Sequence, residues 1–193
     1  MKTFRNEISK EEVNELETRT YKGKVYVIED FSLADDIFYQ LSQAKILGFD
    51  TETKPSFKRG ENHRVSLLQL ATDDAVYLFR LINGGFPLAL KKIFEDERII
   101  KAGVAIRDDL KKLRAIHEFE PSGFCELQDL STQKGIKSNG LRKLSAIVLG
   151  FKISKSQQLS NWEAPTLTES QIFYAATDAW VSRELYINLM NSH

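Results

Sequence analysis

This sequence contains little cysteine, proline or glycine. It also shows no feature that would divide the chain into separate domains. Its single cysteine, Cys125, excludes an intramolecular disulfide and a cysteine-rich zinc site. There are only four prolines and ten glycines, with no repeat, low-complexity tract or long Pro/Gly/Ser linker. We therefore expect one domain over residues 1–193, with its core at about residues 20–190 and a short helical extension at residues 1–20.

Long apolar runs and an excess of one charge are also missing. No run approaches the ~20 apolar residues of a membrane span, and residues 1–17 lack the apolar core of a signal peptide. We therefore expect no membrane partner and a cytoplasmic location. The 27 basic residues balance the 27 acidic ones. This balance argues against nucleic-acid binding by net charge alone, but not against an enzyme whose metal ions neutralise phosphate locally.

The sequence does contain enough apolar residues, 42% of the total, for a proper core. Strand patterns lie at residues 24–28, 46–52, 65–71, 75–79, 99–105 and 124–129. Helix patterns lie at residues 9–17, 32–43, 86–95, 108–117, 138–148 and 169–188. Capping boxes are predicted at Ser9/Glu12 and Thr168/Gln171, and Ser138 and Gly150 are expected to begin and end one helix. This order predicts an α/β layered domain, but not the strand order.

Two carboxylates follow the apolar run at residues 46–49. Asp50 and Glu52 share one face of the predicted strand, because side chains at i and i+2 point the same way. Like charges this close repel one another unless a cation lies between them. Oxygen ligands suit Mg²⁺ or Mn²⁺. The alternative is that the strand has already ended and both acids are solvated.

Two further acidic positions lie later in the chain. Asp108 and Asp109 follow a predicted strand and open a helix, where acids also simply complement the helix dipole. Tyr174 and Asp178 are one turn apart on the last helix, among apolar and small residues. An acid in such surroundings needs a partner, although both residues also fit the edge of a core. If the three acidic positions converge at one end of the sheet, they can hold two cations for phosphoryl transfer.

Three motifs in this order resemble the exonuclease motifs of the DEDD superfamily. They are FDTE at 49–52, GVAIRDDL at 103–110 and YAATDA at 174–179. The tyrosine subgroup, which includes ribonuclease D, is indicated. The histidine subgroup has a histidine five residues before the last acid, where this chain has Phe173.

Within that subgroup the chain is most similar to the Werner-syndrome-type exonuclease domain. Residues 101–109 and 159–179 carry this likeness, and the resemblance covers about residues 20–190. It implies a ribonuclease H-like fold, a five-stranded mixed sheet with helices on both faces. It also implies a metal-dependent 3′-5′ exonuclease, which hydrolyses the terminal phosphodiester of DNA or RNA and releases nucleoside 5′-monophosphates by a two-metal-ion mechanism.

The resemblance also implies the site residues. Asp50, Glu52 and Asp178 correspond to direct ligands of two Mg²⁺ or Mn²⁺ ions. Asp109 matches the family's remaining acid, because it lies six residues after Gly103, and corresponds to a ligand of the second ion, partly through water. Asp108 is expected only to neighbour the site. Tyr174 corresponds to the residue that orients the attacking water.

Contacts with the nucleic acid are predicted from local charge. The segment 131–162 has no acid and six bases: Lys134, Lys137, Arg142, Lys143, Lys152 and Lys155. It leads into Asn161 and Trp162, and is interpreted as a rim that follows the phosphates or, alternatively, as an ordinary solvated face. A second basic cluster comprises Lys54, Lys58, Arg59, His63 and Arg64. From these segments we predict substrate contacts by Arg142, Lys143, Asn161, Trp162, His63 and Arg64, with Thr51 and Leu68 beneath the terminal nucleotide.

Two other functions remain open at this point. The same fold can serve as a non-catalytic nucleic-acid-binding module, or as a partner-binding domain with its acids merely on the surface. Relatives often carry extra nucleic-acid-binding domains. We therefore expect additional binding surface from this chain itself, from self-association or from a helicase or nuclease partner. The choice between DNA and RNA has no sequence signature.

Overall fold

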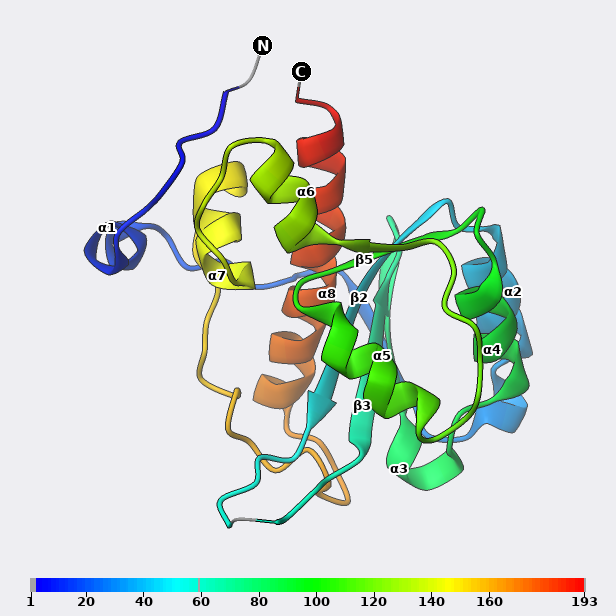
Figure 1. Cartoon of the computed structure of the whole chain (residues 1–193). Coiled ribbons are helices and arrows are strands. Elements are labelled where there is room, and N and C mark those ends of the chain that lie inside the picture. Colours follow the sequence, from blue (N-terminus) through cyan, green and yellow to red (C-terminus); the bar gives the residue numbers. More distant parts are fainter. Residues whose placement is uncertain (1–2, 59, 193) are drawn as a thin grey trace.

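All six predicted strands join one sheet in the computed structural model, which describes residues 3–58 and 60–192 (Figure 1). The strands are β1 (Lys24–Ile28), β2 (Ile46–Thr53), β3 (Val65–Ala71), β4 (Ala75–Arg80), β5 (Ile100–Gly103) and β6 (Phe124–Glu126). Their order is β1-β4-β3-β2-β5-β6. Strand β3 runs antiparallel to its two neighbours, and the other pairs are parallel.

The mixed sheet is confirmed, but its strand number is six rather than the five that the resemblance implied. Strand β1 pairs in parallel with β4 along five residues and forms one edge of the sheet. The ring of Tyr26 stacks on Tyr77 of β4, with 5.4 Å between the ring centres. The segment before β2 therefore satisfies the backbone of β4, which is otherwise an open edge.

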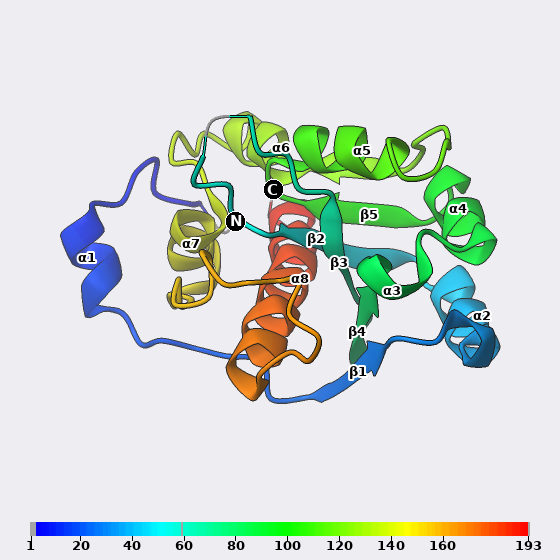
Figure 2. The same ribbon diagram turned by 90° about the horizontal axis from the view of Figure 1, so that it is seen from below.

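Helices cover both faces of the sheet, as predicted (Figure 2). They are α1 (Lys10–Glu15), η1 (Phe31–Leu33), α2 (Asp35–Gln43), α3 (Leu81–Gly84), α4 (Leu88–Glu95), α5 (Ile106–Arg114), α6 (Leu127–Gln133), α7 (Leu141–Leu144), the π-helical turn η2 (Ser145–Leu149) and α8 (Glu169–Met190). Helices α2, α4 and α5 bury one face together with Phe49 and Phe79. Helix α8 covers the other face, where Leu67 and Leu78 meet Ala175 and Ala179.

Two local predictions are wrong. The strand predicted to reach residue 129 ends at Glu126, because the carboxylate of Glu126 accepts a hydrogen bond from the N–H of Gln128 and begins α6. Ser138 does not cap a helix; its hydroxyl accepts from the N–H of Ile8, and α7 begins only after Gly140. Both capping boxes and the helix end at Gly150 are confirmed.

Gly48 sets how closely α8 approaches the central strand β2. A side-chain carbon at this position would lie 1.9 Å from the carbonyl oxygen of Ala179, so only glycine permits this contact. Gly48, Asp50 and Glu52 alternate onto the same face of β2. The backbone of α8, and with it Asp178, is therefore held directly against the strand that carries the first two acids.

Candidate active site

Three carboxylates converge where β2 passes beneath α8. Burial raises the pKa of Asp50 well above its usual range, and the charges of Asp178 and Asp109 raise it further. Burial also raises the pKa of Glu52 to about 10, with the charge of Asp50 as the next cause. Asp178 is 6% exposed, and burial raises its pKa to about 8. Side chains from two elements far apart in sequence therefore repel one another across one site.

Protein cations do not compensate this charge. Within residues 3–58 and 60–192, no salt bridge reaches Asp50, Glu52 or Asp178. In the same ranges, no three His, Cys, Asp or Glu side chains already enclose a metal position. The donors nevertheless fit Mg²⁺ or Mn²⁺, because they are all hard carboxylate oxygens whose mutual repulsion a divalent cation relieves.

Asp109 joins the group from the opposite side of β2. The hydroxyl of Thr51 donates a hydrogen bond of 2.6 Å to Asp109 Oδ1. Burial raises the pKa of Asp109 to about 6, and the bond from Thr51 opposes this rise. The neighbouring Asp108 is exposed. The structure thus places Asp109, and not Asp108, beside the carboxylates, in agreement with the prediction.

Glu126 fixes the start of α5, a role that the sequence gave no reason to expect. Ala105 adopts a left-handed conformation (φ 60°), which turns β5 sharply into α5. The carboxylate of Glu126 accepts hydrogen bonds from the N–H groups of Ala105 and Ile106, at 2.9 and 2.8 Å. These N–H groups have no partner inside the helix. Glu126 therefore positions the first turn, which carries Asp109.

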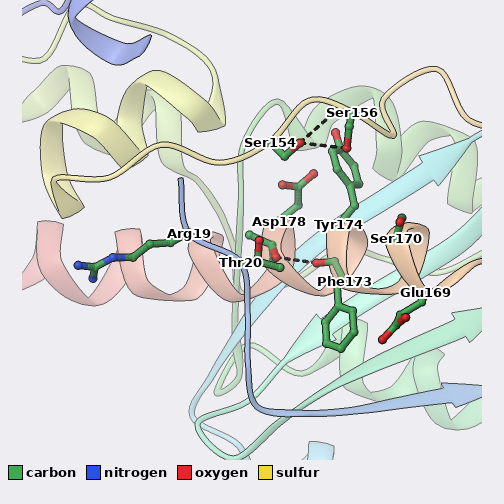
Figure 3. Close-up of a pocket in the computed structure, with 10 residues that line it drawn as sticks. Arg19, Thr20, Ser154, Ser156, Glu169, Ser170, Phe173, Tyr174 and Asp178 are labelled. Atoms are coloured by element: carbon green, nitrogen blue, oxygen red, sulfur yellow. Dashed lines mark hydrogen bonds between the residues drawn. The ribbon is translucent and has the colours of Figure 1, made fainter. Parts of the chain in front are cut away.

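Tyr174 lies one turn before Asp178 on α8, and both side chains point toward the segment that carries Ser154 and Ser156 (Figure 3). The phenol and the carboxylate of Asp178 lie close enough to influence each other's pKa. Burial and the charge of Asp178 raise the pKa of Tyr174 well above its usual value, so the hydroxyl stays protonated. It is therefore a hydrogen-bond donor at neutral pH.

Two cavities meet at Tyr174 and Asp178. The larger, about 720 Å³, also contains Asp50, Thr51 and Glu52. Its opposite wall is basic and is formed by Lys10, Arg142, Lys143 and Lys155. The smaller, about 330 Å³, lies between α8 and Arg19, Thr20 and Ser156 (Figure 3). The larger cavity therefore brings an acidic and a basic surface face to face.

The predicted substrate contacts divide into two groups. Thr51, Arg142 and Lys143 line the larger cavity, where they can reach a bound nucleotide. Leu68 and Trp162 are fully buried and line neither cavity, so the structure gives no support for direct contact by either residue. Leu68 packs in the core beside Phe49, and the Trp162 ring lies 6.0 Å from the ring of Tyr174, where it supports the site from behind.

The remaining predicted contacts lie outside both cavities. The His63 ring and the ammonium group of Lys54 pair with the carboxylate of Glu163, at 3.0 and 3.2 Å. Glu163 thus joins the loop after β2 to the loop before α8.

Arg64 and Asn161 also make contacts within the protein. Arg64 donates a hydrogen bond to the carbonyl oxygen of Ile82, and the side chain of Asn161 accepts one from the N–H of Glu163. Arg59 lies outside the described residues.

Comparison with known families agrees with this geometry. The model of a 3′-5′ exonuclease family matches residues 25–192. The chain belongs to this 3′-5′ exonuclease family. Among curated relatives, the mouse bifunctional 3′-5′ exonuclease/ATP-dependent helicase WRN is 36% identical over 165 residues, covering 82% of this chain and 12% of the relative. Exonuclease 3′-5′ domain-containing protein 2 of Drosophila melanogaster is 37% identical over 149 residues, covering 75% of this chain and 25% of the relative. The chain thus spans a quarter or less of these relatives.

Solved structures of related exonucleases share the fold. The Nibbler EXO domain of Aedes aegypti is 25% identical, with a TM-score of 0.81 over 89% of this chain and 91% of that domain. Ribonuclease D of Trypanosoma brucei, solved in complex with RNA U12, is 20% identical, with a TM-score of 0.78 over 89% of this chain and 64% of that one. The ribonuclease H-like class is confirmed. Among the described residues, no helix has the length and apolar character to cross a membrane.

Proposed function

We propose that this domain hydrolyses the terminal phosphodiester at the 3′ end of DNA or RNA and releases nucleoside 5′-monophosphates. One observation carries the proposal: Asp50, Glu52 and Asp178 face one another without a protein cation in the described part of the chain. A purely structural cluster of this kind is costly, because each buried charge needs a partner. The family match of residues 25–192 supports the same activity.

The proposed cofactors are two Mg²⁺ or Mn²⁺ ions. Asp50, Glu52 and Asp178 would hold them, and Asp109 would contribute from α5. When bound, two such ions activate water and stabilise the charge that develops on the leaving oxygen. Magnesium and manganese share a preference for carboxylate oxygen, so the donor set alone leaves the choice between them open.

The chain's own residues supply the orientation. The Tyr174 hydroxyl, kept protonated beside Asp178, donates its single proton in a hydrogen bond to the attacking water. Thr51 keeps Asp109 against the end of β2. Arg142 and Lys143, on the opposite wall, bind the phosphates of the substrate strand and hold its 3′ end toward the carboxylates.

The partner is proposed to be the 3′ end of a nucleic acid. The ribonuclease D complex with RNA U12 supports RNA as one candidate, and DNA stays open as the other. Self-association, a helicase or nuclease partner and a cytoplasmic location all stay predictions. A non-catalytic nucleic-acid-binding or partner-binding module is the alternative. It gives no reason for all five residues of the site to be present and convergent.

Oligonucleotides labelled at either end test the activity. With Mg²⁺ or Mn²⁺, DNA or RNA labelled at the 5′ end is expected to shorten stepwise, and the 3′-labelled strand to release a labelled mononucleotide at once. Asp50→Asn and Asp178→Asn variants serve as controls for contaminating nucleases. If no substrate shortens, or if both variants cleave as fast as the unchanged protein, the catalytic proposal is wrong.

A further inference from the structure

The N-terminal arm, residues 3–20, precedes the part of the chain that matches the exonuclease family, which begins at residue 25. It nevertheless reaches the active-site cavity. Helix α1 lies beside α7, away from the sheet, in both views of the molecule (Figures 1 and 2). Lys10 and Val13 of this helix line the same cavity as Asp50, Glu52 and Asp178. The arm is therefore one wall of the site.

Several bonds fix the arm in this position. The N–H of Lys137 donates to the carbonyl oxygen of Asn6 at 2.8 Å, and the N–H of Ile8 donates to Ser138. Farther along, Thr18 pairs with Lys152 in a parallel bridge. Two side chains of the arm, Ile8 and Val13, are buried. Both are apolar and pack on η2, where they contact Ala146. The arm is thus docked at both ends and in the middle.

One of these contacts involves a cation of the cavity. The guanidinium of Arg142 donates to Asn14 Oδ1 at 3.0 Å. Arg142 lines the cavity wall opposite the carboxylates, next to Lys143. Asn14 restricts the many rotamers of this long side chain, so the arm contributes to the cavity both its own lysine and the orientation of Arg142.

Helix α1 is acidic overall, but it turns its lysine toward the cavity. Lys10 and Val13 are three residues apart and share one face of the helix. The glutamates Glu11, Glu12 and Glu15 are not among the residues that line the cavity. The packing of Ile8 and Val13 on η2 fixes this rotation, and the carboxylate of Glu12, on the other side, pairs with Arg5 at 2.7 Å. The helix therefore separates its charges by face.

We infer that Lys10 binds a backbone phosphate of the substrate strand, and that the N-terminal arm is a substrate-binding element of this exonuclease. The inference rests on the proposed function. Together with Arg142, Lys143 and Lys155, Lys10 forms a basic wall opposite the carboxylates, and a polyanion fits between the two. Within the described residues Lys10 makes no ion pair, so its charge is available to the substrate.

The test compares Lys10→Ala with Lys22→Ala in the full chain. Both lysines are exposed, and Lys22 lines neither cavity, so it is a matched control for loss of one charge. Binding of a fluorescent single-stranded oligonucleotide is measured by anisotropy in EDTA at several salt concentrations, which separates binding from hydrolysis. Cleavage of the same oligonucleotide in Mg²⁺ gives kcat and KM.

Lys10→Ala is expected to weaken binding about threefold or more, and to lower the slope of log affinity against log salt by about 0.7, the value for one phosphate contact on a single strand. KM should rise by the same factor, with kcat little changed. Lys10→Arg, which keeps the positive charge, should restore both the affinity and KM. If Lys10→Ala binds and cleaves like Lys22→Ala, with equal thermal stability, the inference is wrong although the enzyme is active. If the unchanged protein neither binds nor cleaves, the proposed function itself fails and the inference with it.

Discussion

The hydroxyl of Thr51 donates a 2.6 Å hydrogen bond to Asp109 Oδ1, and this bond joins the end of β2 to the first turn of α5. Thr51 lies between Asp50 and Glu52 in sequence, but its side chain points to the other face of the strand. The residue between the two acids of β2 thus positions the fourth carboxylate. This relationship gives Thr51 a role beyond the predicted contact with the terminal nucleotide.

Thr51→Val tests this role, because valine keeps the shape of threonine and loses the donor. Hydrogen bonds to charged groups contribute about 1.5–3 kcal/mol. We therefore expect a loss of roughly tenfold or more in kcat/KM, and a higher Mg²⁺ concentration for half-maximal rate. Thr51→Ser, which keeps the hydroxyl, should remain close to the unchanged enzyme. Equal metal requirement in Thr51→Val and Thr51→Ser would show that the bond does not position Asp109.

Asp50→Asn should separate activity from stability. Asparagine is neutral without binding a proton and has no repulsion with Asp178, so above about pH 4 the metal-free variant is expected to melt at a higher temperature than the unchanged protein. Its rate should fall about a thousandfold or more, since several kcal/mol of charge stabilisation are lost. Addition of Mg²⁺ should raise the melting temperature of the unchanged protein far more than that of the variant. A variant that is less stable without metal would contradict this account of the cluster.

The pH dependence of stability follows from the raised pKa values of Glu52 and Asp178, about 10 and 8. In the unfolded chain both carboxyls titrate near pH 4, so between these values the folded state binds more protons. Without metal, the contribution of these two groups to the free energy of unfolding should therefore be largest at and below about pH 4, and should fall as pH rises toward 8–10. Urea unfolding in EDTA measures this slope. In saturating Mg²⁺ the slope should flatten or reverse, because the ion favours the ionised carboxylates.

Glu126→Ala tests how the start of α5 is held. The substitution leaves the N–H groups of Ala105 and Ile106 without their acceptor, which we expect to lower the free energy of unfolding by about 1–3 kcal/mol. Activity should fall in addition, because Asp109 lies in the same helical turn. Asp129→Ala is the control: its ion pair with Arg107 is solvent-exposed, so its loss should have little effect. Equal effects of the two substitutions would be inconsistent with a capping role of Glu126.

The sequence by itself determined the order of the six strands along the chain and both capping boxes. These features depend on local patterns: alternation in a strand, helical spacing and turn chemistry act between residues close in the chain. The five candidate site residues were predicted through the resemblance. The three motifs and their order established the resemblance to a known family, and that resemblance implied the metal-dependent chemistry. Trp162 shows the limit of this reasoning, because a residue inside a motif gives no sign of whether it contacts the substrate or supports the site from behind.

Only the tertiary structure decided which surfaces meet. Arg142 contacts Asn14, and Lys10 lies beside them, although these residues are about 130 positions apart in the chain. The carboxylate of Glu126, at the end of β6, caps the N–H of Ala105 at the start of α5. Such contacts depend on the packing of whole elements and leave no periodic trace in the chain. The charge pattern of α1 illustrates this: its composition is acidic, but the packing of Ile8 and Val13 on η2 is what turns Lys10 toward the carboxylates.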